Sequence, residues 1–182
     1  PEPVRRALDL AECHTPEQVR QALSPLLDAY QHWLQNLEQV SPSLPQRYQK
    51  AAHKHLGGCA ESLRRMQEGL ELLCHDAQVR LAFCFAQRAL HEQAAWKGET
   101  LTWRPFQLGF FLQSLQGVAL AQHPDRQICD LLWFPTGGGK TEAYLTQGLG
   151  PNLTDYRAEG PVAEKLLEAM NRDFETRWNI AR

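Results

Sequence analysis

Three consecutive glycines, Gly137, Gly138 and Gly139, stand directly before Lys140 and Thr141 in the stretch LLWFPTGGGKTEAYL. The backbone N–H groups of a glycine loop can surround a polyphosphate, because no side chain obstructs the approach. A lysine ammonium at the end of such a loop binds the outer phosphates, and the hydroxyl of a following threonine ligates Mg²⁺. The spacing therefore predicts a nucleotide-binding loop in which Lys140 has the catalytic role.

The residues around the loop support this interpretation. The apolar run ICDLLWFP at residues 128–135 is the only convincing buried strand in the sequence, and a helix start follows Thr141. The strict phosphate-loop pattern requires glycine at position 134, where this chain has Phe134. The variant PTGGGKT instead matches the version found in superfamily 2 helicases; the alternative is a glycine turn with a chance lysine. The predicted ATP- and Mg²⁺-binding residues of this segment are Thr136, Gly137, Gly138, Gly139, Lys140, Thr141 (the Mg²⁺ ligand) and Glu142.

A second element, TWRPFQ, lies upstream of the loop and contains Arg104, Phe106 and Gln107. A carboxamide can pair with both the donor and the acceptor on the edge of adenine, and a neighbouring aromatic ring can stack on the base. Superfamily 2 motors carry a similar arginine–aromatic–glutamine element before their phosphate loop. We therefore expect these three residues to bind the adenine of ATP. The alternative is an ordinary polar side chain in the first turn of a helix that starts at Pro105.

Helices are expected to position both elements. Apolar residues at three- and four-residue steps predict amphipathic helices at about residues 15–40, 46–74, 77–95 and from 105 onward. Thr15 and Gln18 form a capping-box pattern at the start of the first helix. Gly57 and Gly58 are expected to interrupt the second helix, and the aromatic residues Trp33 and Phe83 are expected to pack in the core. Arg64 and Arg65 are expected on a solvated face, with DNA or a partner as the alternative contact.

These elements predict a mostly α-helical N-terminal region followed by the start of an α/β RecA-like P-loop domain, which makes the chain an incomplete motor fragment. The expected divisions are a helical domain at residues 1–100, the start of the ATP-binding domain at 101–150, and a turn-rich segment with an amphipathic helix at 151–182. We expect this last segment to come from a later part of a longer chain, because TQGLGPNL would stop the helix that follows the loop.

Residues 78–145 also resemble a known family. The segments AFCFAQRAL, WRPFQLGFFLQSL and CDLLWFPTGGGKTEAYL are similar to the DrmA-type helicase-like subunit of the bacterial anti-phage system DISARM. The resemblance implies a large cytoplasmic protein that hydrolyses ATP with Mg²⁺, acts on DNA and works with a DrmB-like partner subunit. It places Lys140 on the phosphates, Thr141 on Mg²⁺ and Gln107 on adenine.

Other features of the sequence limit this interpretation. Hydrolysis requires a second strand that ends in Asp-Glu, and the sequence after residue 145 contains none. The alternative function is therefore a helical protein–protein interaction module with a catalytically incompetent loop. The net charge of −2 does not by itself indicate nucleic-acid binding, and no apolar run approaches the roughly 20 residues that span a membrane. The five cysteines are scattered, which is typical of reduced thiols in a cytoplasmic protein.

Overall fold

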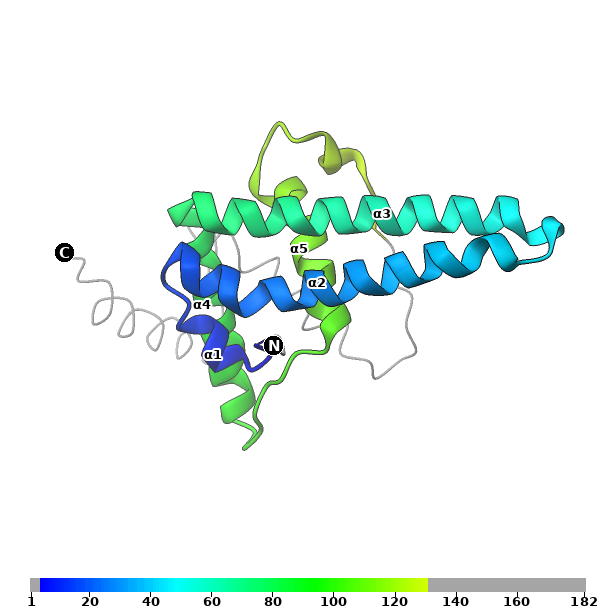
Figure 1. The fold of residues 1–182 in the computed structure, drawn as a ribbon. Helices are drawn as coiled ribbons and strands as arrows, with labels where there is room; N and C mark the ends of the chain where they lie inside the picture. Colours follow the sequence, from blue (N-terminus) through cyan, green and yellow to red (C-terminus); the bar gives the residue numbers. More distant parts are fainter. Residues whose placement is uncertain (1–3, 131–182) are drawn as a thin grey trace.

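The computed structural model describes residues 4–130 of the chain. This part consists of helices and their connections (Figure 1). In chain order the elements are α1 (Ala7–Ala11), α2 (Pro16–Val40), the 3₁₀-helix η1 (Ser41–Ser43), α3 (Gln46–His75), α4 (Ala77–Ala95), α5 (Pro105–Ala119) and the 3₁₀-helix η2 (Pro124–Gln127).

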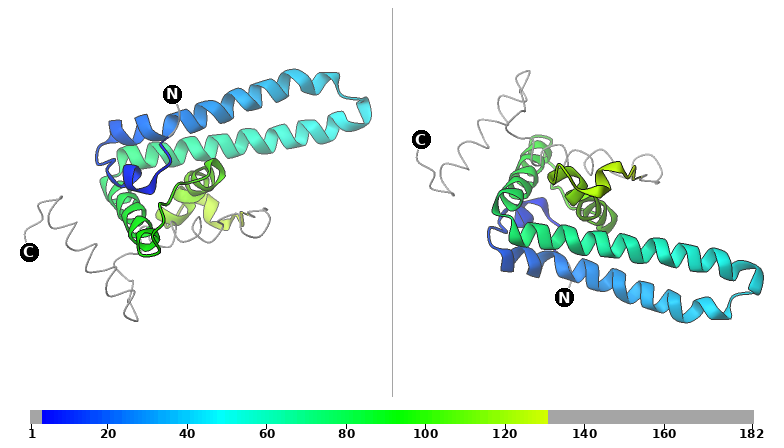
Figure 2. Two further views of the ribbon diagram at one scale, coloured as in Figure 1. Left: turned by 90° about the horizontal axis from the view of Figure 1, so that it is seen from below. Right: turned by 90° about the horizontal axis from the view of Figure 1, so that it is seen from above.

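Helices α2 and α3 form a long antiparallel hairpin whose tip extends beyond the other elements (Figures 1 and 2). Helix α5 packs against α3, and α1 packs against α4 at the other end of the hairpin. The 30 residues of α3 give it a length of about 45 Å at a rise of 1.5 Å per residue. The half of the hairpin near α4 and α5 therefore contributes to the core, while the tip is solvated.

The predicted helix starts and lengths are confirmed in the described part. The Thr15 hydroxyl accepts the N–H of Gln18, and the Gln18 carboxamide oxygen accepts the N–H of Thr15 at 3.0 Å, which completes the predicted capping box. The Asp76 carboxylate caps α4 in a similar way by accepting the N–H groups of Gln78 and Val79. The expected interruption of α3 is wrong, because the helix continues through Gly57 and Gly58.

The core is built around Trp103, which is 1% exposed. Its indole N–H donates to the Gln87 carboxamide oxygen at 2.6 Å, so this buried donor has an acceptor inside the core. The segment that contains Trp103 also pairs with the N-terminal segment: the Trp103 N–H donates to the Arg5 carbonyl, and the Ala7 N–H donates to the Leu101 carbonyl. These bonds place the start of α5 beside the start of the chain.

Two of the sequence-based expectations about aromatic residues have different outcomes. Phe83 is buried at 2% exposure, as predicted. Trp33, in contrast, is 46% exposed, although Leu34 beside it in α2 is buried. Its apolar neighbours Leu37 and Val40 are exposed as well.

The expected α/β RecA-like architecture is wrong for the part of the chain that the structure describes. Residues 4–130 contain no strand, and their only ladder contact is an isolated bridge between Arg6 and Thr102. Ile128, where the predicted strand begins, has an extended backbone, but residues 128–130 do not form a strand. A strand is defined by hydrogen bonds to a neighbouring strand, and no such neighbour exists within residues 4–130. The remainder of the predicted strand, the glycine loop and the segment 151–182 lie outside the described residues, so the division into domains stays a prediction.

Candidate functional site

The structure describes three of the predicted site residues, all at the start of α5. Arg104 immediately precedes the helix and is exposed, Phe106 is half-buried, and Gln107 is 5% exposed. The predicted phosphate- and Mg²⁺-binding residues, Thr136, Gly137, Gly138, Gly139, Lys140, Thr141 and Glu142, lie outside the described residues.

Gln107 has a structural role in the first turn of α5. Its carboxamide oxygen accepts the N–H of Arg104 at 2.7 Å, which satisfies a backbone donor that the helix cannot pair. Pro105 occupies the first position of the helix, where its missing N–H costs nothing. The local sequence therefore fixes where α5 begins, and the predicted contact of Gln107 with adenine is not tested by this geometry.

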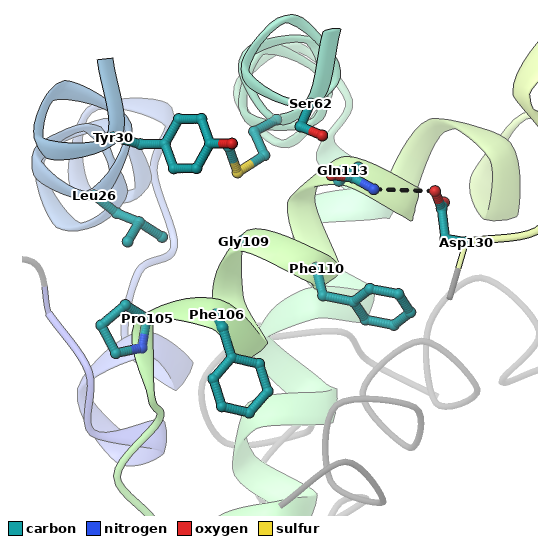
Figure 3. A pocket seen from close by; sticks show the side chains of 10 residues that line it. Leu26, Tyr30, Ser62, Pro105, Phe106, Gly109, Phe110, Gln113 and Asp130 are labelled. Carbon is teal, nitrogen blue, oxygen red and sulfur yellow. Dashed lines mark hydrogen bonds between the residues drawn. The ribbon is translucent and has the colours of Figure 1, made fainter. Parts of the chain in front are cut away.

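A pocket of about 460 Å³ lies beside this first turn (Figure 3). Phe106 and Phe110 extend into it from successive turns of α5, while Tyr30 and Ser62 border it from α2 and α3. Its size is typical of small-molecule sites, and its described lining is mainly apolar. The described lining consists of Leu26, Tyr30, Ser62, Met66, Pro105, Phe106, Gly109, Phe110, Gln113 and Asp130.

Asp130, at the edge of this pocket, is held by a buried arginine. The Arg65 guanidinium donates to both carboxylate oxygens of Asp130, at 2.8 and 2.7 Å, and its Nε donates to the Asp125 carboxylate at 2.8 Å. The Gln113 carboxamide also donates to Asp130, at 3.0 Å. Arg65 is only 6% exposed, whereas the side chains of Asp125 and Asp130 are 9% and 18% exposed. We call these three residues, Arg65, Asp125 and Asp130, the arginine clamp.

The charges in the arginine clamp stabilise one another. The hydrogen bonds from Arg65 hold the pKa of the Asp130 carboxyl below its usual range, against the opposing effect of burial. In return, the hydrogen bond to Asp130 raises the pKa of the Arg65 guanidinium. Both groups are therefore charged at neutral pH, and the bidentate geometry fixes the orientation of the Asp130 side chain.

The arginine clamp was not predicted from the sequence. Arg65 was expected on a solvated face with Arg64, but only Arg64 is exposed, where it pairs with Glu61 and Glu68. The sequence carries no local signal for this burial, because the two carboxylates that hold Arg65 are 60 and 65 residues away in the chain.

Comparison with known proteins finds one family-level relation and no matching family model. The chain is similar to the DISARM protein DrmA of Bacillus paralicheniformis, with 34% identity over 165 residues. The similarity covers 81% of this chain but only 14% of the relative, so the chain spans about one-seventh of that protein's length. The DrmA-like relation indicated by the sequence motifs is thus supported, and the assignment to superfamily 2 is not tested.

The described helices were also compared with the requirements of a membrane span. Within residues 4–130, every helix is too short or too polar to cross a bilayer.

Proposed function

We propose that the chain is the nucleotide-binding part of a DrmA-like subunit in the DISARM anti-phage system. In the longer protein, ATP hydrolysis would drive a superfamily 2 motor that acts on DNA. The observation that carries this proposal is the 34% identity to DrmA across 81% of the chain. The pocket beside α5 supports the proposal, because its lining includes Asp130, which lies only five residues before Pro135 at the start of the PTGGGKT motif.

The described residues fit a purine base. The aromatic side chains of Phe106 and Phe110 offer apolar surfaces for a flat ring, and the pocket volume of about 460 Å³ accommodates one. In this proposal Phe106 contacts the adenine, and Gln107 and Arg104 contribute from the first turn of α5. Gly137–Gly139 and Lys140 bind the phosphates, while Thr141 ligates the Mg²⁺ that neutralises their charge during phosphoryl transfer.

The direct test is substitution of Lys140 in the longer protein that contains this chain. Lys140→Ala is expected to abolish ATP turnover, because the ammonium that binds the outer phosphates is lost. Lys97→Ala is the matched control, since Lys97 is an exposed lysine in the connection after α4. Steady-state phosphate release measures both variants. Wild-type turnover by Lys140→Ala would refute the assigned role.

We propose DNA as the macromolecular partner, in contact with the tip of the α2–α3 hairpin. Arg47, Lys50 and Lys54 are three and four residues apart, so they lie along one face of α3, and all three are exposed. Residues 39–60 contain no Asp or Glu, although the whole chain carries a net charge of −2. We call these three cations the basic stripe. A concentration of positive charge without acidic neighbours is suited to contacts with phosphates.

A second candidate function is a helical protein-interaction module. The observation in its favour is the group of exposed large apolar side chains near the hairpin tip, which are Trp33, Leu37, Val40, Leu44 and Tyr48. A DrmB-like subunit is the partner that this candidate implies. This alternative is favoured if neither the wild-type protein nor its Lys140→Ala variant hydrolyses ATP and the wild-type protein still binds its partner.

A further inference from the structure

The described lining of the pocket beside α5 contains one charged side chain, the Asp130 carboxylate. This side chain is 18% exposed, whereas the Asp125 side chain in the same arginine clamp is 9% exposed and does not line the pocket. The arginine clamp combines two carboxylates with one guanidinium, so the end of the pocket at Asp130 has an excess of negative charge. A ligand group that donates a hydrogen bond is therefore favoured at this end.

The hydrogen bonds of Asp130 leave a position for one more donor. A carboxylate offers about four acceptor positions, two on each oxygen. Oδ1 accepts from the Arg65 guanidinium at 2.8 Å and from the Gln113 carboxamide at 3.0 Å. Among residues 4–130, Oδ2 accepts only from Arg65, at 2.7 Å. Because the bidentate contact with Arg65 fixes the carboxylate, the remaining acceptor position on Oδ2 has a fixed direction.

The face of α5 that lines the pocket connects this acceptor with the start of the helix. Phe106 and Gln113 are seven residues apart, which separates them by about 10 Å along the helix axis at a rise of 1.5 Å per residue. Gly109 lies between them on the same face and has no side chain to divide the pocket (Figure 3). A flat ring that contacts Phe106 or Phe110 can therefore extend toward Asp130.

We propose that Asp130 is a specificity-determining residue of this pocket, in which its Oδ2 atom accepts a hydrogen bond from the exocyclic amino group of adenine. The inference rests on the proposed function, because it assigns Asp130 to the same nucleotide site. The amino group of adenine is a hydrogen-bond donor. A purine that lacks this group covers the carboxylate without pairing it, and an unpaired buried acceptor weakens binding. The pocket thus selects bases that present a donor to Asp130.

The test compares two nucleotides that differ only in this amino group, ATP and purine riboside 5′-triphosphate. In the longer protein, wild type is expected to bind ATP about 10- to 100-fold more tightly, the range that corresponds to one hydrogen bond to a charged group. Asp130→Asn places an NH₂ group at the position of Oδ2, because its oxygen still accepts from Gln113 and Arg65. This variant is expected to lose the preference for ATP and to bind purine riboside triphosphate as wild type does. Isothermal titration calorimetry measures both affinities without requiring turnover.

Asp125→Asn is the matched control, because it removes the same charge from the arginine clamp at a position outside the pocket. It is expected to keep the wild-type preference for ATP. In each of the two variants Arg65 retains one carboxylate partner, so neither leaves a buried cation unpaired. Equal losses of preference in both variants would show that the charge of the arginine clamp, and not a contact of Asp130, favours ATP, and would overturn the inference.

Two further measurements keep the test independent of a single variant. Equal affinities of wild type for the two nucleotides would overturn the inference without any substitution. Asp130→Ala also removes the acceptor and is expected to lose the preference as Asp130→Asn does. If Lys140→Ala retains turnover, the proposed function fails; if Lys140→Ala is inactive but the Asp130 variants keep the wild-type preference for ATP, only this inference fails.

Discussion

At the scale of single residues, the thiols in the described part differ strongly in their surroundings. Burial raises the pKa of Cys13 to about 11 and that of Cys84 to about 12. The Cys84 thiol donates to the Cys13 carbonyl at 3.3 Å, which places both cysteines in the contact between α4 and the end of α1. Cys129, by contrast, is exposed. Since the thiolate is the nucleophile, buried protonated thiols react slowly.

We therefore predict selective alkylation of the folded protein. At neutral pH, iodoacetamide should modify Cys129 well before Cys13 or Cys84, and these two should react only after unfolding in urea. Peptide mass spectrometry over a time course measures the order. The variant Cys129→Ser should lose the rapid modification, and rapid modification of Cys84 in the native protein would contradict its burial.

Residue roles were only partly predictable from the sequence. Gln107 was predicted to bind adenine, which the structure does not test; the hydrogen bond that it makes to the Arg104 N–H agrees with the alternative, a polar side chain in the first turn of a helix that starts at Pro105. Arg65 was assigned to solvent because its partners, Asp125 and Asp130, are more than 50 residues away. Pairing between distant residues depends on how α3, α5 and η2 pack, which periodicity within one helix does not reveal.

At the scale of elements, helix boundaries with a side-chain cap were predicted well. The Thr15–Gln18 capping box starts α2 as expected, because its signal is local. Helix α1 was missed: it has five residues and no side-chain cap, so it lacks both periodicity and a start signal. The continuation of α3 through Gly57 and Gly58 shows that flanking helix formers and packing outweigh the weak propensity of glycine.

The crossing of α3 and α5 depends on Gly69, where a Cβ atom would overlap the backbone carbonyl of Leu112. We predict that Gly69→Ala lowers the free energy of unfolding by about 1–3 kcal/mol, because the two helix backbones must move apart. This loss exceeds the gain of at most about 1 kcal/mol that alanine brings to a helix. Urea denaturation measures the change.

Gly58→Ala in the same helix is the matched control for this prediction. A Cβ at Gly58 has no neighbouring atom within 4 Å, so only the helix propensity changes. This variant should be more stable than wild type by about 0.5–1 kcal/mol. Equal effects of the two substitutions would show that the contact with Leu112 does not limit the packing of α5.

At the scale of the whole molecule, the described helices separate into a packed end and a projecting tip. The packed end carries the pocket and the arginine clamp, and the tip carries the basic stripe on α3. The face of α3 with the basic stripe is opposite the face with Ala52 and Leu56, which are half-buried. The pocket and the basic stripe thus lie at separate places among the described helices.

We predict that the basic stripe contributes directly to the salt dependence of DNA binding. In the longer protein, Arg47→Gln/Lys50→Gln/Lys54→Gln should weaken binding to duplex DNA and reduce the slope of log K against log[salt] by about 3, since each phosphate contact contributes about 0.9. Fluorescence anisotropy at several salt concentrations measures this slope.

The control for the DNA prediction changes the net charge by the same amount at other positions. Arg6→Gln/Arg20→Gln/Lys97→Gln neutralises three exposed cations outside the tip and should leave the slope close to wild type. Similar slopes for both triple variants would mean that overall charge, and not the hairpin tip, governs the interaction.

The overall architecture was the least predictable level. Periodicity indicated the four long helices, whereas the expected α/β fold was inferred from the apolar run that begins at Ile128 together with the glycine loop, the RPFQ element and the family resemblance. A strand depends on hydrogen-bonding partners elsewhere in the chain, so an isolated apolar run is weak evidence for a sheet. The outward projection of the α2–α3 tip likewise had no sequence signal, because the apolar stripe continues along α2 to residues that remain exposed, such as Trp33.

The pairing of the N-terminal segment has a practical consequence for trimming the chain. A shortened protein that begins at Thr15 would remove the carbonyl of Arg5 and the amide of Ala7, which are the main-chain partners of Trp103 and Leu101. The N-terminal segment is thus an integral part of the helical unit. Affinity tags or cleavage sites should be placed before Val4, because the Val4 N–H donates a hydrogen bond to the Ala22 carbonyl.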